Sequence, residues 1–540
     1  MTTSRPQRLI ALALAVLFSR PGLGNGGGAQ AAVGGPPHIV VVMVDDLDAQ
    51  TAEVMLAIGL LPNLQRYVVG RGVRFSQSFV TNSLSAPTRA TYLTGQYAHN
   101  HGVLRNNADA SGSSGGVSSF ADASTLATWL RGAGYRTGFV GKYVNEYGLD
   151  PSAPAGSPRN PSYVPPGWDD WQALVDPWTY LFYGYKINDN HSIVQYGNNP
   201  QDYQTAVLAD RSARFVTGSL TSFPGRPLFL TVAPVNPHAD IITIFLSFLD
   251  GLQYPDIWRW LPRADLRDQT AKPARWSFIF QLPLLPSLKP SFNEADVSDK
   301  PPSLRRPAMT APDMSSLTLQ YQLRLASMLA ADDLVGAVAV ALGDQLANTV
   351  FLFTSDNGFL HGEHRMSDKS VAYEESIHVP LYIAAPGVAG PRTVDAIVLD
   401  NDLAPTLVEL AGAVSTLSPD GRSLAPLLAG PTPADWRKRF LVEYWTSGDA
   451  VFDVPSFAGV RTGSGDVRPQ RLYAEYYAEA LAPATVTDRE LYDLTIDPFQ
   501  LRSLHADPTR ALELEALRAQ TAGLRGCGAS GAPSCHSLEN

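Results

Sequence analysis

Five short runs of apolar and β-branched residues, separated by segments with helical spacing, most constrain the fold of this chain. Continuous apolar runs of this length are typical of strands buried on both faces of a parallel sheet. The helical segments between them supply the crossovers that parallel strands require. The sequence therefore predicts an α/β fold with a mainly parallel central sheet flanked by helices. The predicted strands are 38–44, 73–80, 136–140, 227–233 and 349–354, and the predicted helices are 61–70, 124–132, 201–219, 316–342 and 400–412.

The C-terminal part of the chain follows a different pattern. Its short runs alternate like antiparallel strands, and a closing helix follows them. A Pro- and Gly-rich linker precedes this part, and 540 residues are enough for two domains. We therefore predict a large α/β domain over 36–430 and a smaller α+β subdomain with an antiparallel sheet over 431–540. The strand-like runs are 439–445, 457–461 and 471–477, the closing helix is 511–524 and the linker is 424–433.

The N-terminus has the pattern of a secretory signal peptide, which we place at 1–31. Arg5 and Arg8 precede an apolar run from Leu9 to Phe18, and Ala29-Gln30-Ala31 fits a small-x-small cleavage site. The apolar run is too short to span a bilayer, so we expect no stable membrane span there. The sequence therefore predicts an exported protein, either periplasmic or secreted.

Composition narrows the choice of partners. A net charge of −10 argues against nucleic acid, although a local group of cations would still accept an anionic substrate. Hydrophobic content of 45% with charged content of 17% is typical of a globular protein. The two cysteines, Cys527 and Cys535, most simply form one small disulfide loop in an exported chain.

Acidic side chains follow the first and the last of the predicted buried strands. Asp45 and Asp46 come directly after 38–44, and Asp356 and Asn357 come after 349–354. Open α/β sheets place their sites at the carboxyl ends of strands, and adjacent carboxylates need a positive charge between them. Three carboxylates and one amide oxygen fit Ca²⁺ or Mg²⁺, not Zn²⁺. The alternatives are a loop that caps the next helix and an Asn-Gly turn.

A serine lies where a predicted strand meets a predicted helix. The stretch Ser85-Ala86-Pro87-Thr88-Arg89 follows the run 73–80, and Gly95 can end the helix that begins there. Free backbone N–H groups at a helix N-terminus suit an anionic ester, and Arg89 can point back toward Ser85. The alternative is a Ser-Pro turn that opens a helix with a solvated arginine.

This stretch resembles the nucleophile motif of the sulfatase family: Cys or Ser, any residue, Pro, a small residue, Arg, and then Leu-Thr-Gly, here Leu93 to Gly95. Pro234-Val235-Asn236-Pro237-His238 and Gly362-Glu363-His364 also resemble family segments. The stretch GKYVNEYG, 141–148, resembles arylsulfatases and N-acetylglucosamine-6-sulfatases. The resemblance covers nearly all of the mature chain except an apolar insertion at 239–287, whose role the sequence does not define. It implies an alkaline-phosphatase-like large domain.

The resemblance also implies a mechanism and the residues that perform it. A dedicated formylglycine-generating enzyme would oxidise Ser85, and the hydrated aldehyde would attack sulfur. The four oxygen ligands would hold Ca²⁺ or Mg²⁺, and Asn145 and His364 would help to bind the substrate. The expected catalytic residues are five. Ser85 supplies the nucleophile, Arg89 and Lys142 orient and stabilise it, Lys369 holds the sulfate, and His238 protonates the leaving alcohol. The expected activity is hydrolysis of an aryl sulfate or a sulfated sugar.

Two other functions remain open at this point. An unmodified Ser85 would fit a Ser-nucleophile phosphomonoesterase or phosphodiesterase of the same superfamily. Those relatives usually build two zinc sites and tend to have Asp-His where this chain has Asp356-Asn357, which counts against that function. The other alternative is a catalytically weak homologue that binds sulfated glycans.

Overall fold

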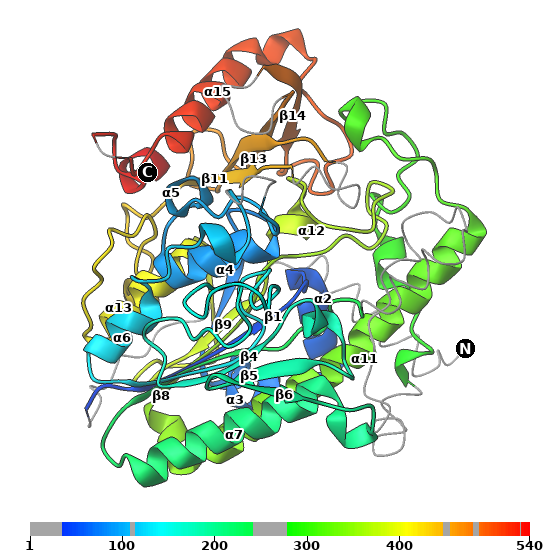
Figure 1. The fold of residues 1–540 in the computed structure, drawn as a ribbon. Coiled ribbons are helices and arrows are strands. Elements are labelled where there is room, and N and C mark those ends of the chain that lie inside the picture. Colours follow the sequence, from blue (N-terminus) through cyan, green and yellow to red (C-terminus); the bar gives the residue numbers. More distant parts are fainter. Residues whose placement is uncertain (1–34, 109–113, 241–277, 447–453, 479–484, 530) are drawn as a thin grey trace.

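The computed structural model describes residues 35–108, 114–240, 278–446, 454–478, 485–529 and 531–540. Its centre is a ten-stranded sheet with helices on both faces (Figure 1). The strand order is β10-β2-β9-β8-β1-β7-β3-β4-β5-β6. The strands are β1 (His38–Val44), β2 (Val73–Phe79), β3 (Arg136–Gly141), β4 (Asp170–Leu174), β5 (Lys186–Asp189), β6 (Ser192–Gln195), β7 (Leu228–Ala233), β8 (Thr349–Ser355), β9 (Leu381–Ala384) and β10 (Arg392–Leu399).

Most neighbouring strands of this sheet are parallel, as the sequence predicts. β8, β1, β7, β3 and β4 form an unbroken parallel set, and β10 pairs in parallel with β2. β9 is antiparallel to both β2 and β8, and β5 and β6 add an antiparallel edge to β4. The sequence analysis did not predict five of the ten strands. β5, β6 and β9 have four residues each, too few to produce a distinct apolar run, and β4 and β10 begin with charged or polar residues that interrupt such a run.

The helices include the predicted ones with shifted ends. α11 begins at Ala311, not at Ser316, because Thr310 and Asp313 form a capping box and Pro312 lies in the first turn. The helices are α2 (Ala49–Ala57), α3 (Pro62–Tyr67), α4 (Ser85–Thr94), α5 (Ala98–His101), α6 (Leu126–Gly132), α7 (Gln204–Ser222), α11 (Ala311–Leu342), α12 (Glu374–Ile377), α13 (Leu403–Ala411), α14 (Ala425–Ala429), α15 (Ala511–Arg525) and α16 (Cys535–Glu539).

The central strand β1 shows why the predicted strands are apolar throughout. Val40, Val42 and Val44 belong to one core, which they share with α2, α3, α7 and α11. Ile39, Val41 and Met43 belong to a second core on the other face, shared with α4, α6, α13 and α14. Because successive side chains of a strand point to opposite faces, a strand covered on both sides must be apolar at every position.

The long helix α11 lies in the core. The segment Ala311–Asn348 is long and apolar enough to cross a membrane, but 78% of its most apolar window is buried inside the protein. Such burial is typical of a core helix. The predicted signal peptide and residues 241–277 of the predicted insertion lie outside the described residues.

The C-terminal part forms a second, antiparallel sheet, as predicted. β11 (Arg439–Tyr444), β12 (Phe457–Thr462), β13 (Arg471–Tyr477) and β14 (Val486–Asp493) follow one another in order, with α15 packed beside them (Figure 1). Leu517 and Leu524 of α15 share a third core with this sheet and with Phe79 of β2. Cys527 and Cys535 form the predicted disulfide. The domain boundary near residue 430 stays a prediction.

Candidate active site

Five strands of the central sheet end at one edge, and each is followed by residues that the sequence analysis selected. β1 and β8 end in register, with Val44 beside Ser355. β3 and β7 also end in register, with Gly141 beside Ala233. The side chains that follow these aligned ends therefore meet. They are Asp45 and Asp46 after β1, Ser85 after β2, Lys142 after β3, His238 after β7, and Asp356 and Asn357 after β8.

Ser85 is the first residue of α4, where the preceding loop meets the N-terminus of the helix. Its side chain is buried, and the residue is 1% exposed. The hydroxyl oxygen lies 3.4 Å from Asp45 Oδ1, 3.5 Å from Asn357 Oδ1 and 3.3 Å from Lys369 Nζ. The first N–H groups of a helix lack intrahelical partners and carry a partial positive charge. Ser85 therefore lies among oxygen ligands and cationic groups that can stabilise negative charge.

Three buried carboxylates face three buried cations around Ser85. Each of the three ion pairs is neutral in net charge, so a divalent cation bound among them would add a charge of about +2 and favour an anionic ester. Arg89 Nη1 also donates to the Lys142 carbonyl at 2.8 Å, so the ion pair of Arg89 with Asp356 is linked to that of Lys142 with Asp45. The pairs are Arg89–Asp356 at 2.8 Å, Lys142–Asp45 at 2.5 Å, and Lys369–Asp46.

These charges change the protonation of the site. Burial alone would raise the pKa of Asp46, but Lys369 and His238 outweigh burial and hold that pKa at about 2. Burial lowers the pKa of His238 more than Asp46 and Asp45 raise it. Asp46 also adopts a left-handed φ of 69°, which few residues other than glycine adopt. The fold therefore holds Asp46 ionised in an unusual backbone conformation.

The loops that carry Lys142 and His238 are anchored to each other and to the core. Gly141 has a φ of 117°, and a Cβ there would lie 2.2 Å from the Ala233 carbonyl. The Lys142 N–H donates to that same carbonyl at 2.8 Å. Before His238, the Asn236 amide donates to the Ser327 hydroxyl at 2.6 Å. These contacts fix the backbone on which both side chains stand.

The residues present fit a hard divalent cation. The ligand atoms of Asp45, Asp46 and His238 lie within 4.8 Å of one another, and all three residues are buried. Asn357 donates its amide to Asp46 Oδ1 at 2.6 Å, so its amide oxygen faces Ser85. Asp356 Oδ1 accepts from the Asp46 N–H at 3.2 Å. A site rich in carboxylate and amide oxygens is the type that Ca²⁺ and Mg²⁺ prefer.

The two predicted substrate-binding residues occupy different places. The Asn145 amide donates to the Tyr180 hydroxyl at 2.8 Å, and Tyr180 lies beside Lys142. His364 instead hydrogen-bonds Glu294 at 2.7 Å, and its ring lies on Tyr373 at 4.1 Å. Among the described residues, no hydrogen bond or ion pair joins His364 to the group around Ser85. The structure therefore brings Asn145, and not His364, into contact with this group.

Sequence reasoning missed two residues of the site. Arg324 of α11 is buried, and its guanidinium donates to the Asp46 carbonyl and lies 4.1 Å from the Phe359 ring centre. Tyr180 is the second. Its ring lies beside the imidazole of His238 and beside the ammonium group of Lys142. Arg324 is the only arginine or lysine of α11, and this isolated cation was a signal available in the sequence. No sequence signal pointed to Tyr180, which lies in a short turn after an unpredicted strand.

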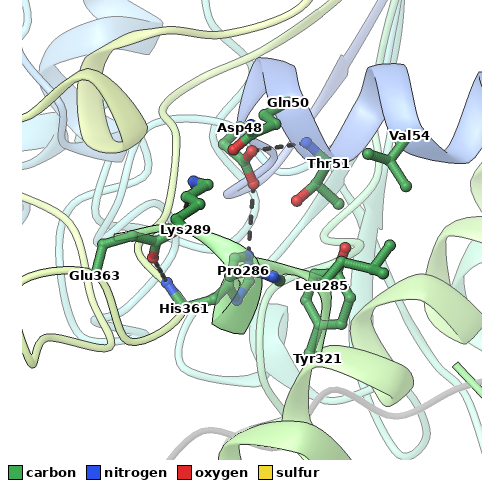
Figure 2. A pocket seen from close by; sticks show the side chains of 10 residues that line it. All are labelled: Asp48, Gln50, Thr51, Val54, Leu285, Pro286, Lys289, Tyr321, His361 and Glu363. Atoms are coloured by element: carbon green, nitrogen blue, oxygen red, sulfur yellow. Dashed lines mark hydrogen bonds and ion pairs between the residues drawn. The ribbon is translucent and has the colours of Figure 1, made fainter. Parts of the chain in front are cut away.

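A pocket lies next to the loop that carries Asp46, and residues of α2 and α11 line part of it. It encloses about 280 Å³, including its open mouth (Figure 2). Asp48 Oδ1 accepts from the Thr51 N–H at 2.7 Å and its other oxygen lies 3.5 Å from His361 Nε2. Lys289 Nζ lies 2.5 Å from Glu363 Oε1. These pairs join the loops that carry Asp46 and Asn357, so the pocket residues support the site.

Comparison with known proteins decides the family. Residues 37–413 match the Sulfatase family, which is well over half of the chain. The chain belongs to the sulfatase family. Sulfatases hydrolyse sulfate esters, so this chain is a sulfuric ester hydrolase. Residues 362–525 also match the C-terminal region of N-sulphoglucosamine sulphohydrolase.

Individual sulfatases resemble this chain over most of their length. The N-acetylglucosamine-6-sulfatase of Capra hircus is 30% identical over 492 residues, covering 87% of this chain and 80% of that protein. The arylsulfatase of Volvox carteri is 30% identical over 518 residues, covering 89% of this chain and 74% of that protein. A solved structure of a protein in complex with its substrate D-glucosamine-2-N,6-O-disulfate has a TM-score of 0.64 and 22% identity, and covers 90% of this chain and 97% of that one. The last likeness confirms the alkaline-phosphatase-like fold.

Proposed function

We propose that this sulfatase hydrolyses sulfate esters of sugars or phenols through formylglycine formed from Ser85 and a divalent metal, Ca²⁺ or Mg²⁺. The observation that carries the proposal is the surroundings of the Ser85 hydroxyl: Asp45, Asn357 and Lys369 all lie within 3.5 Å of it. An ordinary serine nucleophile needs an adjacent general base. Lys369, the amine among these neighbours, is paired with Asp46. Burial would lower the pKa of Lys369, but the nearby carboxylates outweigh burial and raise it. Lys369 therefore stays protonated and does not supply the general base.

Asp45, Asp46, Asp356 and Asn357 would hold the metal. When bound, the metal would lower the pKa of the attacking hydroxyl and neutralise charge on the sulfate oxygens. The hydrated aldehyde has a second hydroxyl, which a serine lacks and which allows sulfate to be expelled. Oxidation of Ser85 removes two hydrogens, and it requires a formylglycine-generating enzyme that acts before export.

The chain's own cations would position and stabilise the transferring group. Lys369 Nζ lies 3.3 Å from the Ser85 hydroxyl, a distance that supports a role for Lys369 in holding a sulfate oxygen. Arg89 and Lys142 pair with Asp356 and Asp45 and would hold these two carboxylates in place beside the nucleophile. His238 would protonate the departing alcohol oxygen.

Sugar sulfates are the substrate class that we favour. The relatives above include an N-acetylglucosamine-6-sulfatase, and the solved structure holds a sulfated glucosamine. Asn145 lies close enough to the site to contact such a substrate, whereas His364 would act only through its neighbours. The Cys527–Cys535 disulfide supports export to an oxidising compartment, periplasmic or extracellular.

The decisive experiment is mass spectrometry of Ser85 in protein purified from its native host. Trypsin releases the peptide Phe75–Arg89, which contains Ser85. We expect a species two hydrogens lighter that a hydrazide reagent captures. A peptide with only unmodified serine would contradict the mechanism. Side-by-side hydrolysis of aryl sulfate and aryl phosphate, with a glycan-binding assay, would then separate a phosphoesterase from a sulfated-glycan-binding homologue.

Metal binding has its own test, independent of turnover. After treatment with a chelator, Ca²⁺ should raise the thermal midpoint of the wild type, because a ligand that binds only the folded state stabilises it by about 2.7 kcal/mol at 100 times its Kd. Asp45→Asn should lose most of this rise, because it removes one of the charged ligands. Asp395→Asn, an exposed substitution, is the matched control and should retain it. An equal rise in both variants would exclude Asp45 as a ligand.

A further inference from the structure

Tyr180 touches three residues of the candidate site at once. It lies in a 3-10 turn, η3 (Trp178–Tyr180), that follows the parallel strand β4. Its ring centre lies 4.6 Å from that of His238 and 4.8 Å from Lys142 Nζ. Its hydroxyl accepts a hydrogen bond from the Asn145 amide at 2.8 Å. No role follows for Tyr180 from the sulfatase motifs described above.

The backbone around Tyr180 is held in place by buried polar contacts. Just before the turn, Asp176 Oδ2 accepts from the Glu146 N–H at 2.6 Å. Within the turn, the Thr179 carbonyl accepts from the side chain of Gln204 at 2.8 Å, and Gln204 is fully buried at the start of α7. The Tyr180 ring therefore stands on an anchored segment and can act as a fixed wall for its neighbours.

The three contacts of Tyr180 differ in kind. The Lys142 ammonium lies beside the aromatic ring, whose electron-rich face attracts a cation. The ring contact with His238 restricts rotation of the imidazole, whose Nε2 lies 3.8 Å from Asp46 Oδ2. The Asn145 bond orients the phenol. Burial and the nearby Asp176 keep the phenol protonated, because both raise the pKa of Tyr180.

We propose that Tyr180 is a positioning residue for sulfate ester hydrolysis. Its ring holds His238 in the orientation that delivers a proton to the departing alcohol oxygen, and it keeps Lys142 against Asp45. This inference rests on the proposed function, because it assumes that His238 is the proton donor. General acid catalysis matters most when the leaving group is a poor one, so the role has a distinctive kinetic signature.

The test compares Tyr180→Leu, Tyr180→Phe and the wild type on a series of aryl and sugar sulfates whose leaving alcohols span a wide range of pKa. For Tyr180→Leu we expect kcat/KM to fall by roughly 10- to 100-fold for the poorest leaving groups and much less for 4-nitrophenyl sulfate. Tyr180→Phe keeps the ring and should remain close to wild type throughout. Trp178→Leu is the matched control, since Trp178 shares the turn but its ring lies against Lys186, 3.5 Å away.

A second measurement does not depend on turnover. In histidine-labelled protein, the ring-proton signals of His238 should shift in Tyr180→Leu, because the aromatic neighbour is lost, and stay in place in Tyr180→Phe and Trp178→Leu. Unmoved His238 signals, or an equal loss of rate for every leaving group, would overturn the proposal that Tyr180 positions His238. A wild type that hydrolyses no sulfate ester, but whose His238 signals depend on Tyr180, would overturn the proposed function and leave the contact itself established.

Discussion

Ser85→Ala should abolish sulfate ester hydrolysis, with kcat lowered by at least about 10⁴-fold. Alanine cannot be oxidised to an aldehyde and offers no oxygen to attack sulfur. The remaining groups, Arg89, Lys142 and Lys369, would still bind an anionic ester, so we expect KM to change far less than kcat. Initial rates on 4-nitrophenyl sulfate and on a 6-sulfated glucosamine would measure both parameters.

Ser83→Ala is the matched control for this substitution. Ser83 is also buried, and its hydroxyl has no hydrogen-bond partner among the described residues. Removal of that hydroxyl should therefore leave the thermal midpoint and the rate close to those of the wild type. If Ser85→Ala retained more than a small fraction of the rate, the nucleophile would have to be another group, and the whole assignment of the site would fail.

The central sheet and the position of the site could be predicted because both depend on local patterns. Strands covered on two faces leave uninterrupted apolar runs, as β1 and β8 do. Polar residues directly after such runs mark the carboxyl edge of the sheet, which is how Asp45 and Asp356 were found. Parallel pairing in register then brought these residues together without any further information from the sequence.

The sequence could not predict features that depend on packing between distant segments. Tyr180 reaches Lys142 and His238 only because β4 pairs beside β3, and the short β4 was not predicted. Arg324 meets the Asp46 carbonyl because α11 shares a core with one face of β1, which the helix pattern alone does not reveal. His364 is a residue that the sequence selected but the fold keeps away from the group around Ser85. Its motif lies near Lys369 in the sequence, yet its ring contacts Glu294 and Tyr373.

Glu539→Ala should cause the largest loss of stability among these variants. Glu539 of α16 is fully buried, and its Oε2 lies 2.8 Å from Arg437 Nε and 3.4 Å from Arg422 Nη2. Its other oxygen accepts from the Tyr97 hydroxyl at 2.6 Å. Burial would lower the pKa of Arg437, but Asp402 and Glu539 outweigh it and raise that pKa, so the guanidinium stays charged. Removing one partner from a buried charge pair typically costs about 3–5 kcal/mol.

The Glu539→Ala substitution should destabilise the region near Ser85 as well as the C-terminus. Tyr97 precedes α5, and α5 follows α4, so loosening of α16 withdraws support from the helix that begins at Ser85. Urea unfolding would measure the free energy, and hydrogen exchange would place the loosened amides. Glu515→Ala is the control, because Glu515 is exposed and its one ion pair among the described residues is with exposed Arg518 at 3.2 Å. If both variants lost stability equally, the buried pairs of Glu539 would contribute no more than a surface ion pair does.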